Sequence, residues 1–186
     1  METAELIFVS GGVRSGKSSF GERLAIEKAE KIGGALHYIA TGSNSDAEMK
    51  ERIMKHQQDR MESHANWKTW EKETSVHELA SCFKQGDVLL LDCLTTLLNN
   101  EFFSGEYESQ ERKIYERICK GIEHLSESCS TLIVVSNEVL NEPLLDNTLV
   151  YTYCRLIGHL HQRLVEKATE AYLVEAGIPK QMKKGG

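Results

Sequence analysis

The chain has 186 residues, of which 40% are hydrophobic and 27% charged, and this length and composition predict a single globular domain over residues 1–186. Its formal net charge of −6, without a run of Lys or Arg, argues against a broad nucleic-acid-binding surface or a surface for anionic membranes. Five scattered cysteines, no signal-like N-terminal segment and no apolar run of about 20 residues predict reduced thiols, no membrane span and a cytoplasmic location.

Five short apolar segments are expected to form strands, and several are apolar throughout rather than alternating. They are Leu6–Ser10, Leu36–Ala40, Val88–Asp92, Thr131–Ser136 and Ala171–Glu175. Helical patterns lie between them, at Ser18–Lys31, Asp46–Met61, Gln110–Glu127 and Asn147–Thr169. Continuously apolar strands that alternate with helices are typical of an α/β fold, with a mainly parallel sheet flanked by helices.

One further segment, Asn99–Ser109, is polar and acidic but contains Phe102, Phe103 and Tyr107. Its composition predicts a surface loop. A second interpretation is an aromatic edge that packs on a neighbouring subunit or on a ligand.

The first predicted strand runs directly into a glycine-rich loop, and a predicted helix follows it. The loop fits the pattern G-x-x-x-x-G-K-[ST] and consists of Gly11, Gly12, Val13, Arg14, Ser15, Gly16, Lys17 and Ser18. Glycines let the backbone wrap closely around phosphate oxygens, and the N–H groups at the start of the helix then face the anion. Lys17 is expected to reach the outer phosphates and Ser18 to ligate Mg²⁺. The loop therefore predicts a nucleoside-triphosphate site.

A second metal ligand is expected where the third predicted strand ends. The apolar segment Val88–Asp92 closes on an acid, which is the position that P-loop enzymes use to hold Mg²⁺. Asp92 is therefore predicted to hold the metal together with Ser18. The alternative is that Asp92 caps the next helix. Thr95 and Thr96 follow directly and could orient phosphate or water, although threonine is also an ordinary residue at the start of a helix.

The second predicted helix contains Arg52, His56 and Arg60, which are spaced by four and so share one face. Nearby guanidinium groups disfavour the imidazolium form, and neutral imidazole is the form that acts as a nucleophile or base. The two arginines also suit a phosphate-bearing substrate. The spacing alone leaves open an inert, exposed histidine.

Together with the alternating Trp67, Thr69 and Glu71, a segment compatible with a short strand, these residues give a family resemblance. From Ile7 to about Pro179 the chain resembles the adenosylcobinamide kinase / adenosylcobinamide-phosphate guanylyltransferase family. The resemblance rests on Gly11–Ser18, Tyr38–Thr41, Asp46, Glu48, Met49, Arg52, Ile53, His56, Arg60, Trp67, Thr69, Glu71, Leu90–Thr96, Ser136–Val139 and Ala176–Pro179. This combination is far more specific than the glycine-rich loop alone.

The resemblance implies a bifunctional enzyme of cobalamin biosynthesis, built on a P-loop NTPase fold of RecA-like type and assembled as a homotrimer. Such an enzyme phosphorylates adenosylcobinamide, a corrinoid, with ATP or GTP. It then transfers GMP from GTP to adenosylcobinamide phosphate through a covalent guanylyl-histidine, for which His56 is the matching residue. Lys17 and Asp92 complete the catalytic set. Beyond the glycine-rich loop, nucleotide contacts are implied for Thr41, Gly42, Ser43, Arg52, Gln57, Gln58, Asp59, Arg60, Glu71 and Asp92.

Two other interpretations remain open. A small-molecule P-loop kinase would use the same loop without nucleotidyl transfer, and His56 would then be structural or phosphate-binding. A nucleotide-binding regulatory protein would lack the acceptor site, and the departure from the family pattern at Leu140 falls where acceptor contacts are expected. The joint presence of Lys17, Asp92 and His56 favours an enzyme.

Overall fold

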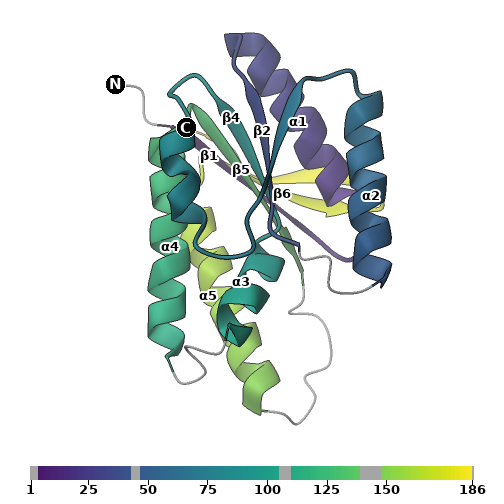
Figure 1. Cartoon of the computed structure of the whole chain (residues 1–186). Coiled ribbons are helices and arrows are strands. Elements are labelled where there is room, and N and C mark those ends of the chain that lie inside the picture. The colour runs from purple at the N-terminus through teal and green to yellow at the C-terminus, as the bar shows by residue number, and fades with distance from the viewer. Residues whose placement is uncertain (1–3, 43–46, 105–109, 139–147, 186) are drawn as a thin grey trace.

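A computed structural model describes residues 4–42, 47–104, 110–138 and 148–185, apart from the side chains at positions 47–49 and 52. Its centre is one seven-stranded sheet with the order β3-β2-β4-β5-β1-β6-β7 (Figure 1). All neighbouring strands are parallel except β6 and β7, which form an antiparallel pair at one edge. The strands are β1 (Glu5–Gly11), β2 (Leu36–Ala40), β3 (Trp67–Glu71), β4 (Val88–Asp92), β5 (Thr131–Asn137), β6 (Glu170–Glu175) and β7 (Ile178–Lys183).

Helices cover both faces of this sheet, with α1 and α2 on one side and α3, α4 and α5 on the other (Figure 1). The helices are α1 (Lys17–Ile32), α2 (Ala47–Glu62), α3 (Leu94–Phe103), α4 (Glu111–Glu127) and α5 (Thr148–Lys167), with a short 3₁₀ helix η1 (Val76–Cys82) before β4. None of the helices in the described part of the chain is both long and apolar enough to cross a membrane.

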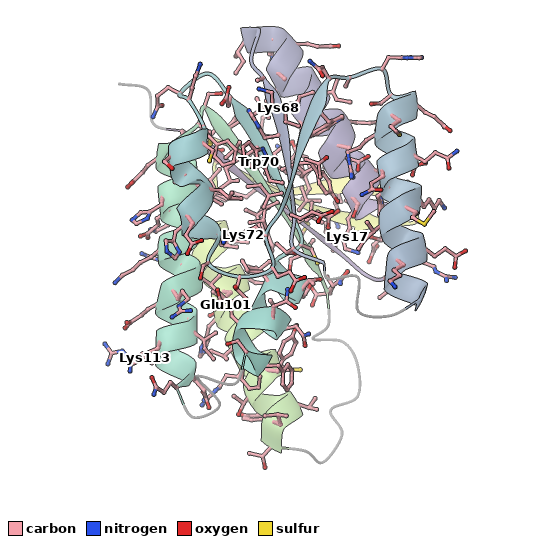
Figure 2. The ribbon with its side chains drawn as sticks, viewed as in Figure 1. Lys17, Lys68, Trp70, Lys72, Glu101 and Lys113 are labelled. Carbon is pink, nitrogen blue, oxygen red and sulfur yellow. The ribbon has the colours of Figure 1, made fainter. Side chains whose placement is uncertain are left out.

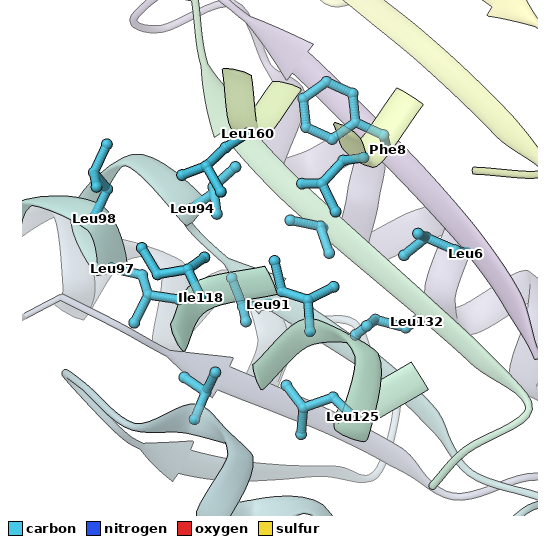
Figure 3. Close-up of a cluster of buried hydrophobic side chains, with 14 of the residues drawn as sticks. Leu6, Phe8, Leu91, Leu94, Leu97, Leu98, Ile118, Leu125, Leu132 and Leu160 are labelled. Atoms are coloured by element: carbon cyan, nitrogen blue, oxygen red, sulfur yellow. The ribbon is translucent and has the colours of Figure 1, made fainter. Parts of the chain in front are cut away.

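Alternate residues of each central strand enter two different cores. In β1, Leu6 and Phe8 pack with α3, α4 and α5, in the cluster that Figure 3 draws, whereas Ile7 and Val9 pack with α1. Because both faces of the sheet are covered, both sets of positions must be apolar. This coverage of both faces explains why the strand segments of the sequence are apolar throughout.

The predicted α/β architecture is confirmed: the five expected strands are β1, β2, β4, β5 and β6, and the four expected helices are α1, α2, α4 and α5. The segment with alternating Trp67, Thr69 and Glu71 is β3, at one edge of the sheet. The edge strand β7 was not predicted, because it is polar and short and contains Pro179, a residue tolerated only at sheet edges.

The prediction of a surface loop at Asn99–Ser109 is wrong for its first half. Residues 99–103 complete α3, and Phe102 is 2% exposed and packs edge-on against Tyr153 of α5. The helix that begins with the apolar residues of Leu94–Leu98 continues through the polar asparagines that follow them. Phe103 is exposed, and residues 105–109, Tyr107 included, lie outside the described residues.

The parallel strands end at one edge of the sheet, and this edge positions the candidate site. Gly11 of β1 lies opposite Asn137 of β5, and Asp92 of β4 lies opposite Val135 of β5 and Ala40 of β2. In open α/β sheets, ligands bind outside the carboxyl ends of the strands, where the strand order reverses. The glycine-rich loop and the acid that ends β4 are therefore brought together by the topology itself.

Candidate functional site

The glycine-rich loop joins β1 to α1 in a tight cradle. Gly11 needs its lack of a side chain, since a Cβ there would lie 2.5 Å from Ser15 Oγ and 2.6 Å from the Val174 carbonyl oxygen. Gly16 has a φ of 89° and precedes the first residue of α1, so the chain enters the helix through the left-handed region that favours glycine. The free N–H groups at the start of α1 consequently face the loop, as an anion-binding cradle requires.

The turn between β6 and β7 supports this cradle from outside. Gly177 N–H donates to the Ser15 carbonyl oxygen over 2.7 Å, and a Cβ on Gly16 would lie 3.2 Å from Gly177 Cα. The turn passes through Ala176 and Gly177, with φ values of 47° and 78°. The antiparallel pairing of β6 with the unpredicted strand β7 thus places the turn between them against the phosphate loop.

Lys17 lies between the sheet and α2 (Figure 2) and is only 5% exposed. Its Nζ donates to the Gly12 carbonyl oxygen over 3.0 Å, across the mouth of the loop. Ser15 Oγ is buried and, among the residues the structure describes, has no hydrogen-bond partner. An anion in the cradle would bring acceptor atoms to both groups.

Asp92 faces the same edge from β4, and its carboxylate is held by a neighbour. The Tyr38 hydroxyl donates to Asp92 Oδ2 over 2.9 Å. Burial, reinforced by the Asp92 charge, raises the pKa of Tyr38 well above its usual value, so the hydroxyl keeps its proton and remains a donor. Behind Asp92, the Thr41 hydroxyl accepts from Cys93 N–H and donates to the Cys93 carbonyl oxygen, both over 2.8 Å. Thr41 is fully buried and braces the end of β4 through these contacts.

Helix α2 lies over two hollows that share His56, Lys17 and Ser18. The first, of about 540 Å³, is formed by the phosphate loop and one face of α2 and is lined by Arg14, Ser15, Gly16, Lys17, Ser18, Ser19, Glu51, Lys55, His56 and Asp59. The second lies deeper, over the ends of β2, β3, β4 and β5, and is lined by Lys17, Ser18, Tyr38, Ala40, Gly42, Ile53, His56, Gln57, Arg60, Thr69, Glu71, Asp92, Cys93, Thr96 and Asn137. The imidazole of His56 therefore faces both the phosphate cradle and the pocket along the sheet edge.

Arg60 fixes the carboxyl-terminal end of α2 to the body of the protein. Its guanidinium lies 3.6 Å from the centroid of the Tyr38 ring and donates to Glu22 Oε1 of α1 over 3.3 Å. Both charged residues are buried. Burial raises the pKa of Glu22 to about 7, and Arg60 opposes that shift. Arg60 therefore shares the face of His56, as predicted, but its guanidinium is already hydrogen-bonded to Glu22.

The remaining predicted nucleotide contacts are divided between several environments. Gly42, Gln57 and Glu71 line the deep hollow, and Asp59 lines the hollow at the phosphate loop. Gln58 is exposed and donates to Glu62 Oε1 over 3.0 Å. Three further predicted residues line neither hollow in the described structure: Val13 is 61% exposed at the tip of the loop, while Ser43 and the Arg52 side chain lie outside the described residues.

Several lining residues were not predicted as site residues. Lys55 lies one position before His56 and faces the phosphate loop, and Tyr38, Thr69 and Asn137 line the deep hollow, as does Thr96, for which a phosphate- or water-orienting role was one of two interpretations. The signal that identifies most of them is position: Asn137 ends β5, Tyr38 and Thr69 lie two positions before the ends of β2 and β3, and Thr96 follows the end of β4 in α3. Without the strand order, the sequence does not show which strand ends are neighbours.

The fold has a counterpart among solved structures. The flagellar accessory protein FlaH from Methanocaldococcus jannaschii superposes with a TM-score of 0.53 at 14% identity, covering 97% of this chain and 79% of that chain. At this level of identity the similarity concerns the fold alone, which is a P-loop NTPase fold of RecA-like type.

Sequence comparison identifies much nearer relatives. The bifunctional adenosylcobalamin biosynthesis protein CobU of Salmonella typhimurium (strain LT2) is 32% identical over 188 residues, covering 96% of this chain and 99% of the relative. CobU of Escherichia coli (strain K12) is 30% identical with the same coverage. The bifunctional adenosylcobalamin biosynthesis protein CobP of Pseudomonas aeruginosa is 35% identical over 176 residues, covering 94% of this chain and 95% of the relative.

Residues 7–182 match the family described as CobU, cobinamide kinase / cobinamide phosphate guanyltransferase. This match spans the phosphate cradle, Asp92, α2 with His56, and the β6–β7 turn that supports the cradle. The chain therefore belongs to the cobinamide kinase / cobinamide phosphate guanyltransferase family of cobalamin biosynthesis enzymes.

Proposed function

We propose that this protein phosphorylates adenosylcobinamide with ATP or GTP, and then transfers GMP from GTP to adenosylcobinamide phosphate through a covalent guanylyl-histidine at His56. Membership of the family supports both half-reactions. The observation that favours the covalent route is the place of His56, which lines the hollow at the phosphate loop and also the hollow along the sheet edge. A nucleophile at that junction reaches a triphosphate from one side and an acceptor from the other.

The phosphoryl transfer would use the cradle and Mg²⁺. The backbone N–H groups of Gly11–Ser18 and Lys17 would hold the β- and γ-phosphates. Ser18 and Asp92 line the same hollow and offer the hard oxygen ligands that Mg²⁺ takes, so they fit this ion as its protein ligands, with phosphate oxygens and waters completing the shell. The metal would neutralise charge on the phosphates. Tyr38 would keep the Asp92 carboxylate oriented through its 2.9 Å hydrogen bond.

The guanylyl transfer would proceed in two displacements. An imidazole nitrogen of His56 attacks the α-phosphorus, the bond to the β-phosphate breaks, and pyrophosphate leaves with the electron pair. A phosphate oxygen of the acceptor then attacks the same phosphorus, and the P–N bond breaks to restore neutral imidazole. Splitting the transfer in this way leaves GMP on the protein between the two steps.

The guanine base is assigned to the part of the deep hollow formed by β3. Glu71 and Thr69 are two residues apart in β3, so their side chains share a face, and both line the hollow beside Gln57 of α2. A carboxylate accepts hydrogen bonds from the two N–H donors on guanine's Watson–Crick edge, a pair that adenine lacks. Glu71 would therefore select guanine over adenine.

Arg60 would contribute by positioning. Its contacts with Glu22 and the Tyr38 ring hold the end of α2, one turn after His56, against α1 and β2. The phosphate contacts expected of Arg60 and Arg52 remain part of the proposal, as do the nucleotide contacts of Thr41, Ser43 and Gln58. The homotrimer, the cytoplasmic location and the organisation of residues 1–186 as one nucleotide-binding domain are likewise proposed from the resemblance and the composition.

The experiment is intact-mass spectrometry of the protein after incubation with GTP and Mg²⁺. We expect an acid-labile mass gain of one GMP in the natural protein and none in His56→Ala. The matched control is His124→Ala, which removes an exposed histidine on α4, on the opposite face of the sheet. An adduct that persists in His56→Ala would refute the nucleophile, and bound GTP without any adduct would leave phosphoryl transfer as the only activity.

A further inference from the structure

Asn137 ends β5 at the point where the two reactive parts of the site meet. In the sheet it lies opposite Gly11, the first residue of the phosphate loop, and Glu138 N–H continues that pairing by donating to the Gly11 carbonyl oxygen over 2.8 Å. Asn137 and Val135 share a strand face, and Val135 packs in the core beneath α1. The Asn137 side chain therefore stands on the α1 side of the sheet, where it lines the deep hollow with Lys17 and Asp92.

Only the nitrogen of the Asn137 side-chain amide has a hydrogen-bond partner among the described residues. Its Nδ2 donates to Thr95 Oγ1 over 3.2 Å, and that hydroxyl is itself 3.0 Å from Cys93 Sγ. Its Oδ1 is buried and has no hydrogen-bond partner within the described part of the chain. Leaving a buried acceptor unsatisfied costs about 1–3 kcal/mol, so such an atom in a native pocket calls for an explanation.

The chemistry of Oδ1 restricts what can satisfy it. An amide oxygen only accepts hydrogen bonds, and so do the ionised phosphate oxygens of a nucleotide. The two therefore cannot form a hydrogen bond with each other. The guanine N–H donors are assigned to Glu71 on β3, three strands away from β5, which is roughly 14 Å at the usual strand spacing. The group that faces Asn137 must therefore be a different donor, close to the outer phosphates held by Lys17. The hydroxyl group of an alcohol bound beside the outer phosphates is a hydrogen-bond donor of this kind.

We propose that Asn137 is the positioning residue for the acceptor alcohol in the phosphoryl transfer, an inference that rests on the proposed function. Its Oδ1 accepts the hydrogen bond of the alcohol and so directs an oxygen lone pair at the γ-phosphorus. The new O–P bond forms as the bond to the β-phosphate oxygen breaks, the electron pair leaves on the nucleoside diphosphate, and the hydroxyl proton is released to water. Thr95 fixes the rotation of the amide so that the oxygen, not the nitrogen, faces the alcohol.

The test compares Asn137→Ala with the natural protein in three assays: phosphorylation of adenosylcobinamide, hydrolysis of ATP in the presence of that acceptor, and formation of the GMP adduct. We expect kcat/KM for the alcohol to fall between about tenfold and 100-fold, because misplacing a reactant by about 1 Å costs that much. We also expect a larger share of ATP to be lost to water in the presence of acceptor, while GMP adduct formation and the Mg²⁺ requirement stay within about twofold. Asn99→Ala, an exposed asparagine on α3, is the matched control.

The outcomes separate the inference from the function on which it rests. Unchanged alcohol phosphorylation in Asn137→Ala would overturn the inference alone. A parallel fall in adduct formation, or a raised Mg²⁺ requirement, would assign Oδ1 to a metal-bound water and overturn it as well. Failure of the natural protein to phosphorylate the alcohol would overturn the proposed function and this inference with it. Asn137→Asp, which keeps the shape and an acceptor oxygen, is expected to recover part of the coupling between ATP use and alcohol phosphorylation.

Discussion

A buried histidine behind the site makes the stability of the fold depend on pH. His161 of α5 is 8% exposed, lies 5.1 Å from the Phe8 ring, and has its Nε2 2.7 Å from Ser136 Oγ, the residue just before Asn137. Burial lowers the pKa of His161 from 6.5 to about 4. The folded protein therefore holds this imidazole neutral over a pH range in which the unfolded chain protonates it.

The magnitude follows from the two pKa values. Below pH 6.5 the unfolded state binds the proton and the folded state does not, so the free energy of unfolding falls as the pH falls, until both states are protonated below about pH 4. The full loss is about 3 kcal/mol, at 1.36 kcal/mol for each pH unit between the pKa values. At pH 5 about 2 kcal/mol of it is already lost.

Urea unfolding of the natural protein and of His161→Gln at pH 8 and pH 5 measures this loss directly. The natural protein is expected to lose about 2 kcal/mol more than the variant between the two pH values, because every other titrating group cancels in the comparison. His159→Gln, at an exposed position of the same helix, is the control and should behave as the natural protein. Parallel pH profiles for the natural protein and His161→Gln would refute the assignment.

Four further outcomes are expected. Tyr38→Phe removes the donor to Asp92 and should lower Mg²⁺-dependent phosphoryl transfer roughly tenfold in a coupled ADP assay, with nucleotide binding nearly unchanged. Gly16→Ala places a side chain at φ 89° and 3.2 Å from Gly177 Cα, so thermal unfolding should show a loss of at least about 1–2 kcal/mol, and calorimetry should show weaker ATP binding. Phe102→Ala should cost about 3–5 kcal/mol in urea unfolding, since the ring is 2% exposed. Chelating Mg²⁺ with EDTA should weaken GTP binding far more than GMP binding in the same calorimetric assay.

The sequence predicts most of the fold because its signals are local. A strand such as Val88–Asp92, buried on both faces, is apolar up to its last residue, and the glycine-rich loop has glycine where the backbone requires it, as at Gly16 with a φ of 89°. The elements it does not predict depend on distant partners. The polar strand β7 pairs only with β6, and the end of α3 is stabilised by Phe102 packing against Tyr153 of α5.

The same distinction applies to the candidate site. The glycine-rich loop and Asp92 are predicted from the residues next to them in the chain, and His56 is predicted through the family resemblance. The pairing of Arg60 with Glu22 is not, because the two residues are 38 positions apart and meet only once α2 folds over α1. Nor is the half-satisfied amide of Asn137, since its partner Thr95 is 42 positions away. A helical spacing of four predicts which residues share a face, but not what that face meets.

An acidic chain that binds a polyanion must concentrate cationic groups locally, and the cradle does this only in part. The hollow at the phosphate loop contains the cations Arg14, Lys17 and Lys55 but also the anions Glu51 and Asp59, a surplus of one positive charge among its described lining residues. Arg60, the buried cation nearby, is paired with Glu22 and adds little to that surplus. A nucleoside triphosphate has a charge of about −4, with a last pKa close to that of a phosphate monoester. Side-chain charge alone therefore would not balance a bound triphosphate, and under the proposed function the N–H groups at the start of α1 and a divalent cation held by Ser18 and Asp92 would supply the difference. The metal would then serve nucleotide binding as well as phosphoryl transfer.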